Sequence, residues 1–394
     1  MATNLFEGQA WQTVKTGLCE GLQDKKRENF EKVLENTRKY MMNESASFGA
    51  TSSGNIATLN KVVLPMLRRV MPNVIANEIM GVQPLPGPVA QIHTMRYVYS
   101  QNSAEVNAGT EALSPFEVAR AYSGNNNPND PGAASTANLE GQTGRRIAVN
   151  IVKQTAEAKT RRLSSRWTVE SAQDAESQFG IDIESEIMAG LAQEITTEID
   201  QELLGRLRNL ARTGAIYDMT QDASFTGSPT FVGDRHAVLT TLINQQANLI
   251  AQRTRRGRAN WVVIDPMALT ILQSATTSNF ARTTEGSFDD PDNQKLVGTL
   301  NNTIKVYVDT YADEGTPVLI GYKGQNEFDA GSFYCPYVPL TATPVITDPN
   351  TFENVVGFMS RYAYVELSNT AESFGNAADY LSKIDIPAGT IKFI

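Results

Sequence analysis

One apolar repeat constrains the fold of this chain more than any other feature of its sequence. Large apolar residues recur at every fourth position over a long stretch, namely Phe179, Ile183, Ile187, Leu191, Ile195, Ile199, Leu203 and Leu207. This spacing predicts one helix over about residues 181–213, roughly 45–50 Å long, with Gly214 as its stop. Because steps of four residues drift around the helix axis, this helix is expected to lie across a sheet with different neighbours along its length.

A second feature is a pair of alternating segments that flank a polar stretch. Residues 91–99 and 146–155 alternate with period two, which predicts two strands. Residues 123–144 between them are rich in Asn, Gly, Pro and Ala. An extended hairpin of this kind cannot bury much surface by itself, so it must lie on another chain or on its own body.

The remaining elements are shorter. The patterns predict helices at residues 62–79 (broken at Pro72), 240–252 and 266–272, and strands at residues 261–264, 304–308, 318–322 and 355–365. Residues 1–60 are expected to form a loose polar arm, with one amphipathic helix at 23–42 and a flexible link at 45–53. The apolar stripe of that helix is thin, so the helix is expected to lean on a partner surface.

The composition argues against several classes of protein. Hydrophobic residues make up 41% and charged residues 20% of the 394 residues, which is ample for a globular core. The net charge of −9 argues against DNA binding as the main activity, because proteins that grip phosphates usually carry the opposite sign. The two cysteines, Cys19 and Cys335, support neither a disulfide framework nor a zinc site. Without a visible secretory signal or membrane span, we expect a protein kept in the cytoplasm until it assembles.

A search for chemistry finds no established pattern. His93 and His236 have no second ligand at metal-binding spacing and are better explained as ordinary strand and loop residues. The acidic group Asp289, Asp290 and Asp292 lacks the glycine and the later glutamate of a calcium loop, so a solvated loop is favoured. Nucleotide-binding and hydrolase motifs are absent from the sequence. We therefore expect no catalytic, cofactor-binding or metal-binding residues.

Charged residues supply the candidate contacts with other subunits. The sharpest basic run consists of Arg253, Arg255, Arg256 and Arg258. It is open to three interpretations: a solvated turn, a phosphate contact, or a patch that binds acidic groups of a neighbouring subunit. The last is favoured over DNA in an acidic protein. The hairpin contributes four more candidates, Glu105, Glu111, Arg145 and Arg146.

Several longer segments resemble the major capsid proteins of tailed bacteriophages of the T-even type. They are LRRVMPNVIANEIMGVQPLPGP at 67–88, EAKTRRLSSRWTVESAQD at 157–174, WVVIDPMALTIL at 261–272, GYKG at 321–324 and DAGSFYCPYVPLT at 329–341. They keep the order of the family, and with the long helix they cover most of residues 60–365.

The resemblance implies an α+β, Hong-Kong-97-like phage capsid fold. Its parts would be an N-terminal arm at 1–60, the start of the P domain at 61–82, an E-loop hairpin at 83–155, the P domain with its long spine helix at 156–214, an A domain at 215–335, and a P-domain return with C-terminal strands at 336–394. The function implied is that of a major capsid protein, which self-assembles as hexamers and pentamers into the icosahedral head of the virion.

The resemblance also implies partners. These would be further copies of the chain together with scaffold, portal, vertex and cement proteins, around double-stranded DNA that is enclosed without sequence-specific binding, and with no membrane. Three alternatives stay open: a vertex or minor capsid subunit of the same fold, an α/β hydrolase that uses the acids near 289–292, and a nucleic-acid-binding module.

The sequence departs from the family in two respects. It is short for a T-even-type subunit, so the insertion domain of the larger relatives is expected to be missing. Residues 85–150 contain no lysine, so the isopeptide cross-link that some capsids of this fold make from an E-loop lysine is expected to be unavailable. The subunits are then expected to be locked together without covalent bonds.

Overall fold

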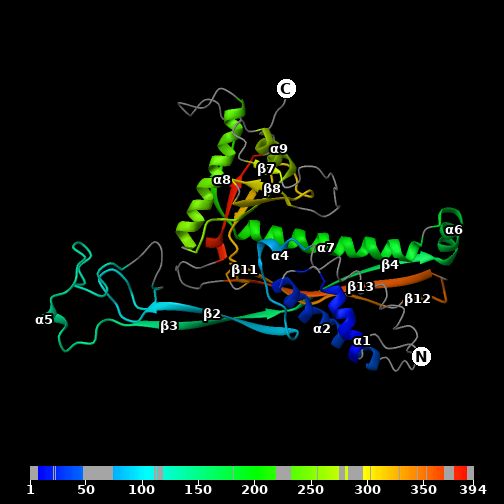
Figure 1. Cartoon of the computed structure of the whole chain (residues 1–394), viewed down its shortest axis with the longest axis horizontal. Helices are drawn as coiled ribbons and strands as arrows, with labels where there is room; N and C mark the ends of the chain where they lie inside the picture. The colour runs from blue at the N-terminus through cyan, green and yellow to red at the C-terminus, as the bar shows by residue number, and fades with distance from the viewer. Residues whose placement is uncertain are drawn as a thin grey trace. The chain divides into compact units, whose positions relative to one another are not determined.

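The architecture is given by a computed structural model (Figure 1). It describes residues 8–20, 22, 24–47, 74–110, 112, 119–180, 182–218, 232–254, 256–274, 280–282, 296–301, 303–327, 329–343, 345–351, 353–367 and 377–387. The chain divides into two compact units. The first comprises Met1–Ala90, Ala156–Gly205 and Phe333–Val365, and the second comprises Gln91–Thr155, Arg206–Ser332 and Glu366–Ile394.

The first unit is built on a mixed sheet. Its strands are β1 (Gly81–Val82), β11 (Ser332–Ala342), β13 (Glu353–Glu366) and β12 (Ile346–Thr347), in that order, and β4 (Lys159–Thr168) also pairs with β13. β1 runs parallel to β11, whereas β4 runs antiparallel to β13 over ten residue pairs, from Glu353↔Thr168 to Tyr362↔Lys159. The sheet therefore joins segments that lie far apart in the sequence.

The helices of this unit include α1 (Gly8–Leu18), α2 (Asp24–Ser47), α4 (Ala76–Ile79), α6 (Val169–Phe179) and the greater part of α7 (Ile183–Leu210). α6 begins where the Thr168 hydroxyl accepts a hydrogen bond from the Ser171 N–H, and it ends at Gly180 in the left-handed region at φ 65°. α7 starts at Ile183, directly after Asp182, whose carboxylate accepts a hydrogen bond from the Glu184 N–H at 3.1 Å. Within the first unit α7 lies along β4 and β13 (Figure 1).

The predicted long helix is confirmed, with one correction at its end. Ile195, Ile199, Leu203 and Leu207 of the fourfold repeat are buried in α7. Arg212, Thr213 and Gly214, however, belong to strand β5 (Arg212–Ile216) and not to the helix end. A Cβ atom at Gly214 would lie 2.0 Å from Oε1 of the buried Gln246, so this glycine is needed for close packing and does not stop the helix.

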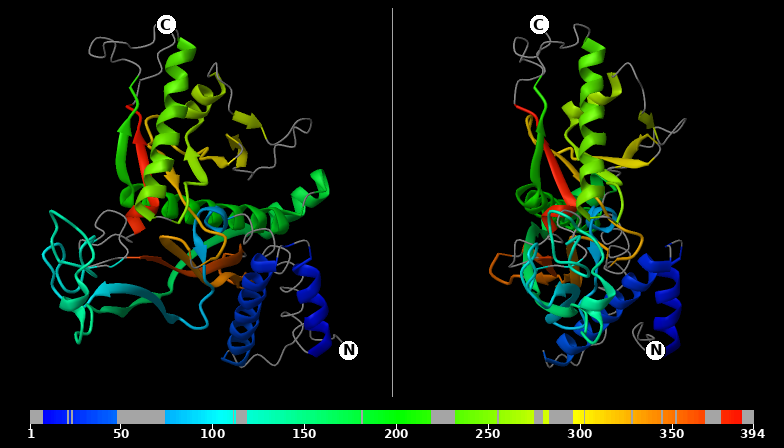
Figure 2. Two further views of the ribbon diagram at one scale, coloured as in Figure 1. Left: turned by 60° about the vertical axis from the view of Figure 1, so that its left-hand side comes forward. Right: turned by 90° about the vertical axis from the view of Figure 1, so that its left-hand side faces the viewer.

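The second unit contains a mixed seven-stranded sheet. Its order is β5, β14 (Leu381–Asp385), β10 (Val318–Gly321), β6 (Trp261–Ile264), β9 (Ile304–Val308), β8 (Leu296–Leu300) and β7 (Phe280–Arg282). The helices α8 (Val232–Thr254) and α9 (Pro266–Ser274) and the short 3-10 helix η1 (Ala377–Tyr380) complete this part. Leu239, Ile243 and Ile250 of α8 pack into one apolar core with residues of the strands, and α8 lies along the sheet in both views of Figure 2.

A third sheet is a hairpin of two strands. It consists of β2 (Val89–Tyr99) and β3 (Ile147–Glu157), and the connection between them carries the short helix α5 (Thr136–Leu139). Both predicted strands are therefore confirmed. Tyr99, Val106, Ala112 and Tyr122 form a small apolar cluster of their own within the hairpin connection.

Other predictions are confirmed in part. The strands at 261–264 and 304–308 have the predicted bounds, and the predicted helix at 240–252 is longer, from Val232 to Thr254. Of the predicted helix at 62–79, residues 62–73 lie outside the described residues and α4 covers only 76–79. The link expected from Ser45 is wrong at its start, because α2 continues through Ser47; residues 48–53 lie outside the described part. Among the helices described, none is long and apolar enough to cross a bilayer.

Candidate assembly contacts

Two of the predicted contact residues order the tip of the hairpin. The Glu105 carboxylate accepts a hydrogen bond from the Ala121 N–H at 3.0 Å. The Arg145 guanidinium donates from Nη1 to the Asn126 side-chain oxygen at 2.6 Å and lies over the Tyr122 ring, 5.5 Å from its centroid. Both charged side chains therefore have partners within the hairpin. Their hydrogen bonds stabilise a segment that has little apolar core.

Arg146 is placed differently from Arg145. Its carbonyl oxygen accepts hydrogen bonds from the Tyr122 hydroxyl at 2.6 Å and from the Ser100 N–H at 3.1 Å. Its side chain is exposed, and no ion pair joins it to the part of the chain that the structure describes. Glu111 lies outside the described residues. Among the three hairpin candidates that the structure describes, Arg146 is thus the one whose charge is most accessible to a partner.

The stem of the hairpin exposes an apolar stripe. Ile147, Val149 and Ile151 of β3 are 52%, 53% and 65% exposed, and Val89 of β2 is 59% exposed. Alternate residues of a strand point to one face, so Ile147, Val149 and Ile151 form a row, while Asn150 points to the other face. Such a row of aliphatic side chains in water marks a surface that a partner can cover.

The described arginines of the predicted basic run have different surroundings. Arg256 forms an ion pair with Asp329 at 2.7 Å, and Arg258 donates to the Asn244 side-chain oxygen at 3.3 Å. Arg253 lies in the last turn of α8, partly buried, and Arg255 lies outside the described residues. Arg256 and Arg258 thus have partners in their own chain. Arg253 differs from both because it lies within a helix and is partly buried.

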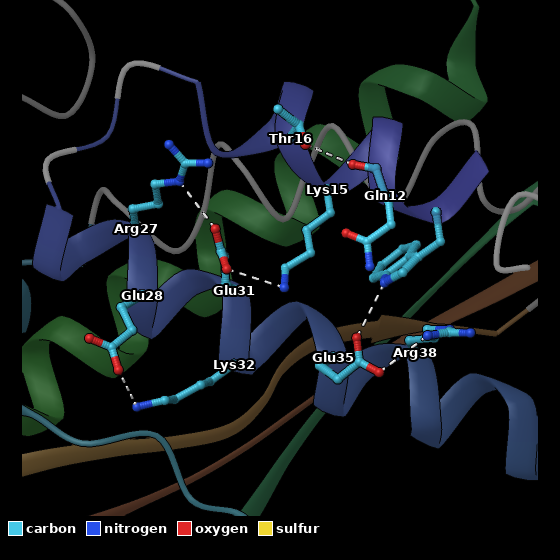
Figure 3. A network of polar contacts seen from close by, with 10 residues as sticks. Gln12, Lys15, Thr16, Arg27, Glu28, Glu31, Lys32, Glu35 and Arg38 are labelled. Atoms are coloured by element: carbon cyan, nitrogen blue, oxygen red, sulfur yellow. Dashed lines mark hydrogen bonds and ion pairs between the residues drawn. The ribbon is translucent and has the colours of Figure 1, made fainter. Parts of the chain in front are cut away.

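The arm contains contacts that the sequence patterns missed. α1 and α2 are joined by polar bonds: the Trp11 indole donates to Glu35 at 3.2 Å, and Lys15 of α1 pairs with Glu31 of α2 at 3.2 Å (Figure 3). Glu31 also pairs with Arg27 at 3.1 Å. Burial by itself would raise the pKa of Glu31, but the hydrogen bonds from Arg27 and Lys15 outweigh it and lower that pKa.

α2 also packs on its own chain. The Asn36 side chain donates to the Leu85 carbonyl at 2.8 Å, the Asn29 side chain donates to the Val82 carbonyl at 3.4 Å, and Lys26 pairs with Glu78. Asn29 and Asn36 are seven residues apart, so they lie on one face of the helix, two turns from each other. The described arm helices therefore belong to the first unit, and the surface on which α2 leans is part of its own chain, so the expectation of a loose arm is wrong for α2. The feature of the sequence that could have indicated this contact is the pair Asn29 and Asn36, whose side-chain amides can donate to backbone carbonyls beside a short strand.

A charged network fixes α7 to the sheet of the first unit. Arg161 of β4 pairs with Glu198 at 2.7 Å and donates to the Tyr362 hydroxyl of β13 at 2.7 Å. On the same helix, the Asp200 carboxylate accepts a hydrogen bond from the buried Ile75 N–H at 2.9 Å. These residues are structural, since they tie three segments of distant sequence together.

His93 lies on a strand, as expected, whereas His236 lies in a helix and not in a loop. His236 is buried in α8, where its Nδ1 lies against the Ser274 hydroxyl, and burial lowers its pKa. His93 is exposed on β2. Asp289, Asp290 and Asp292 lie outside the described residues, and the described His, Cys, Asp and Glu side chains form no group that could hold a metal ion.

The described residues combine a long helix on a mixed sheet, an α/β unit, and a hairpin stem with an exposed apolar row, and they form no group that could hold a metal ion, which is the description of a structural subunit. The sequence profile of the family Major capsid protein Gp23 matches residues 56–142 and 131–386, which is most of the chain. The chain belongs to this family of major capsid proteins. It is accordingly a structural protein of the phage head and not an enzyme, with the mixed α+β fold of phage capsid proteins.

Individual relatives agree with this assignment. The chain is 26% identical to the major capsid protein of Vibrio phage KVP40 over 83% of this chain and 80% of the relative. It is 27% identical to that of Escherichia phage AR1 over 83% and 78%. Among solved structures, the capsid of Myoviridae Phage XM1 aligns at a TM-score of 0.43 and 10% identity, over 78% of this chain and 90% of that chain.

Proposed function

We propose that this chain assembles with copies of itself as hexamers and pentamers into a closed icosahedral head around double-stranded DNA. The observation that carries the proposal is the row Ile147, Val149 and Ile151, which is more than half exposed on a hairpin of only two strands. A two-stranded hairpin is marginally stable in water by itself. Covering the row with a neighbouring copy removes apolar surface from water and supports the hairpin at the same time.

We assign the parts of the family's fold to the following segments of the chain. The arm would span residues 1–60, the P domain 61–82, 156–214 and 336–394, the E-loop 83–155, and the A domain 215–335. The hairpin β2–β3 supports the E-loop assignment, the helix α7 supports the spine-helix assignment, and the seven-stranded sheet supports the A-domain assignment.

The proposed contacts between copies include the charged candidates. They are Arg253, Arg255, Arg256, Arg258, Glu105, Glu111, Arg145 and Arg146. The accessible charge of Arg146 favours a direct role, whereas the partners of Glu105, Arg145, Arg256 and Arg258 within the chain favour an indirect role, in which they shape the surface that a neighbour meets.

Further partners are proposed by analogy with the family. A head of this kind needs a portal and vertex proteins, and its assembly uses a scaffold; a cement protein would add locking that residues 85–150, which contain no lysine, do not supply through an isopeptide bond. The net charge of −9 supports enclosure of DNA without sequence-specific binding, because an acidic subunit does not grip phosphates strongly.

The experiment compares two substitutions on the same strand. Val149→Asp places a carboxylate in the apolar row, and Asn150→Asp places the same charge on the opposite face. Assembly of the full-length chain, with its scaffold where one is needed, is followed by sedimentation and electron microscopy. We expect Val149→Asp to raise the concentration needed for assembly by about a hundredfold or more, because the charge must be buried at the contact. Asn150→Asp is expected to assemble like the unaltered chain.

Either of two results would count against this function. The first is that the unaltered chain forms no rings, tubes or shells even with its scaffold, which would exclude self-assembly. The second is that Val149→Asp assembles as readily as Asn150→Asp, which would show that the apolar row is not covered in the shell.

A further inference from the structure

The two faces of strand β4 in the first unit differ in character. Arg161 pairs with Glu198 of α7, so the side chains of β4 that share its face point toward that helix. Successive residues of a strand point to opposite faces, so Arg162 and Arg166 point to the other face of the sheet. Both of these arginines are exposed, whereas the residues that alternate with them from 161 to 167 are at least partly buried.

Two further strands add apolar side chains to this face. Arg166 stands opposite Val355 of β13, and Val355 stands opposite Ile346 of β12, so the three side chains form a row across the sheet. The Arg166 side chain is 63% exposed and Ile346 is 62% exposed. Arg162 lies four residues from Arg166 along β4, which is about 13 Å. We call Arg162, Arg166, Val355 and Ile346 the arginine face.

The two arginines of this face have little compensation from the described part of the chain. Arg166 approaches the Glu353 carboxylate at 3.8 Å with its side chain largely in water, and such a pair stabilises little. No hydrogen bond or ion pair joins the Arg162 side chain to the described residues. The face therefore combines exposed apolar area with guanidinium groups whose planar donors match a carboxylate.

A surface of the complementary charge lies on α6. Between Arg166 and Arg206 the sequence contains ten Asp or Glu residues and no Lys, Arg or His. Asp174 and Glu176 are exposed in the C-terminal half of α6, where the helix dipole disfavours anions. Neither side chain forms an ion pair with the described residues. These two carboxylates are therefore favourable sites for a cation that their own chain does not supply there.

We propose that the arginine face of one copy binds Asp174 and Glu176 of α6 in a second copy. No ion pair joins the two charged sets within one chain, so their pairing needs another copy. Every copy carries both surfaces, so the contact is heterologous and repeats around a closed ring. DNA is less suited to this face, because a duplex needs several phosphate contacts to bind at physiological salt. The inference rests on the proposed self-assembly and adds to it a contact distinct from the hairpin row.

The first test asks whether the arginine face is accessible in single subunits and covered in particles. Ile346→Cys places a thiol on the face, and the two native cysteines, Cys19 and Cys335, are buried and contribute little background. We expect a thiol reagent to label this position at least about tenfold more slowly in particles than in unassembled subunits, because the contact excludes the reagent. Fast labelling in both states would mean that the shell leaves the face uncovered, and slow labelling in both would mean that the chain covers it by itself. Either result would overturn the inference.

The second test reverses one charge at a time. Arg162→Glu places an anion on the arginine face, and Lys32→Glu is the control, since it reverses an exposed charge on α2 of the same unit. We expect Arg162→Glu to raise the concentration needed for assembly by about tenfold, because like charges then meet at the contact. Its unassembled subunits are expected to unfold at the same temperature as the unaltered chain, and Lys32→Glu is expected to assemble normally.

A full exchange of charges separates a contact between copies from other occupants. Arg162→Glu and Arg166→Glu are combined in one chain with Asp174→Arg and Glu176→Arg. We expect this chain to assemble within about threefold of the unaltered concentration, because the reversed surfaces attract each other again, whereas either half of the exchange assembles poorly. Poor assembly of folded, fully exchanged subunits would overturn the pairing. Normal empty shells from the two arginine substitutions, with loss of DNA from filled particles, would identify DNA as the occupant and overturn it as well.

The outcomes also separate this inference from the general function. If the unaltered chain does not assemble even with its scaffold, the proposed function fails. If it assembles and Arg162→Glu assembles equally well, only the contact at the arginine face fails.

Discussion

Arg161 of β4 and Glu202 of α7 form an ion pair of 2.5 Å, and the Tyr362 hydroxyl of β13 hydrogen-bonds to both. Burial by itself would lower the pKa of Arg161, but the hydrogen bonds to Glu202 and Tyr362 outweigh it and raise that pKa. The net shift means that the charged form of Arg161 is favoured in the folded chain. The long helix of a shell subunit is thereby fixed to its sheet by charge-assisted hydrogen bonds as well as by apolar packing.

Removing the arginine should loosen that attachment. We expect Arg161→Met to lower the free energy of unfolding by about 1–3 kcal/mol, because Glu202 and Tyr362 lose a charged partner. The neighbouring Arg162 is exposed on the other face of β4, so Arg162→Met should change stability by less than about 0.5 kcal/mol. Denaturant unfolding of both variants measures the difference, and equal stability would show that the network contributes nothing.

Two glycine substitutions should have opposite signs. A Cβ atom at Gly321 would lie 2.1 Å from the Trp261 ring, so Gly321→Ala should destabilise the chain by about 1–3 kcal/mol through overpacking. A Cβ atom at Gly190 in α7 would meet no described neighbour within 4 Å apart from the backbone of its own helix, so Gly190→Ala should stabilise the chain by about 0.5–1 kcal/mol. Thermal unfolding tests both, and a stabilising Gly321→Ala would contradict the close contact.

The Cys335 thiol should be unreactive in the folded chain. Burial raises its pKa to about 12, whereas an unfolded thiol ionises near 9. Between these values the folded chain holds more protons than the unfolded chain, so this thiol makes stability fall as the pH rises above about 9 and leaves it unchanged below. Labelling with a thiol reagent at pH 8 should be slow until denaturant is added. Because Cys19 is also buried, rapid labelling of the native chain at either site would contradict the packing.

The shell should dissociate into single chains on a denaturing gel. Residues 85–150, which include the whole connection between β2 and β3, contain no lysine and cannot supply the amine of an isopeptide cross-link; the lysine of the hairpin, Lys153, lies in the stem strand β3. Boiled particles are expected to run as one band near 43.1 kDa. A ladder of covalent oligomers would refute non-covalent locking, and mass spectrometry of its rungs would locate the bond.

Local patterns of apolar residues predicted the elements whose burial is periodic or continuous along the sequence. The repeat in α7 specified its helix because side chains four residues apart share one face, and the run Trp261–Ile264 specified β6 because all four side chains are buried. The candidate contact residues were predicted less well. Charge shows which residues prefer water, but it does not show that Arg256 meets Asp329 while the enclosed Nη1 of Arg253 lacks an acceptor.

The sequence by itself determined the long helix, the hairpin strands and the capsid family, because periodic burial and segment order are written along the chain. Only the tertiary structure decided that the polar segment Lys159–Thr168 is a strand, since ten pairs with β13 from almost two hundred residues away stabilise it. It likewise decided that the Asn36 side chain hydrogen-bonds to the Leu85 carbonyl and that β5 is the terminal strand of the seven-stranded sheet in the described part of the chain. Hydrogen bonds between distant segments depend on which backbone groups the fold leaves free, and no local pattern contains that information.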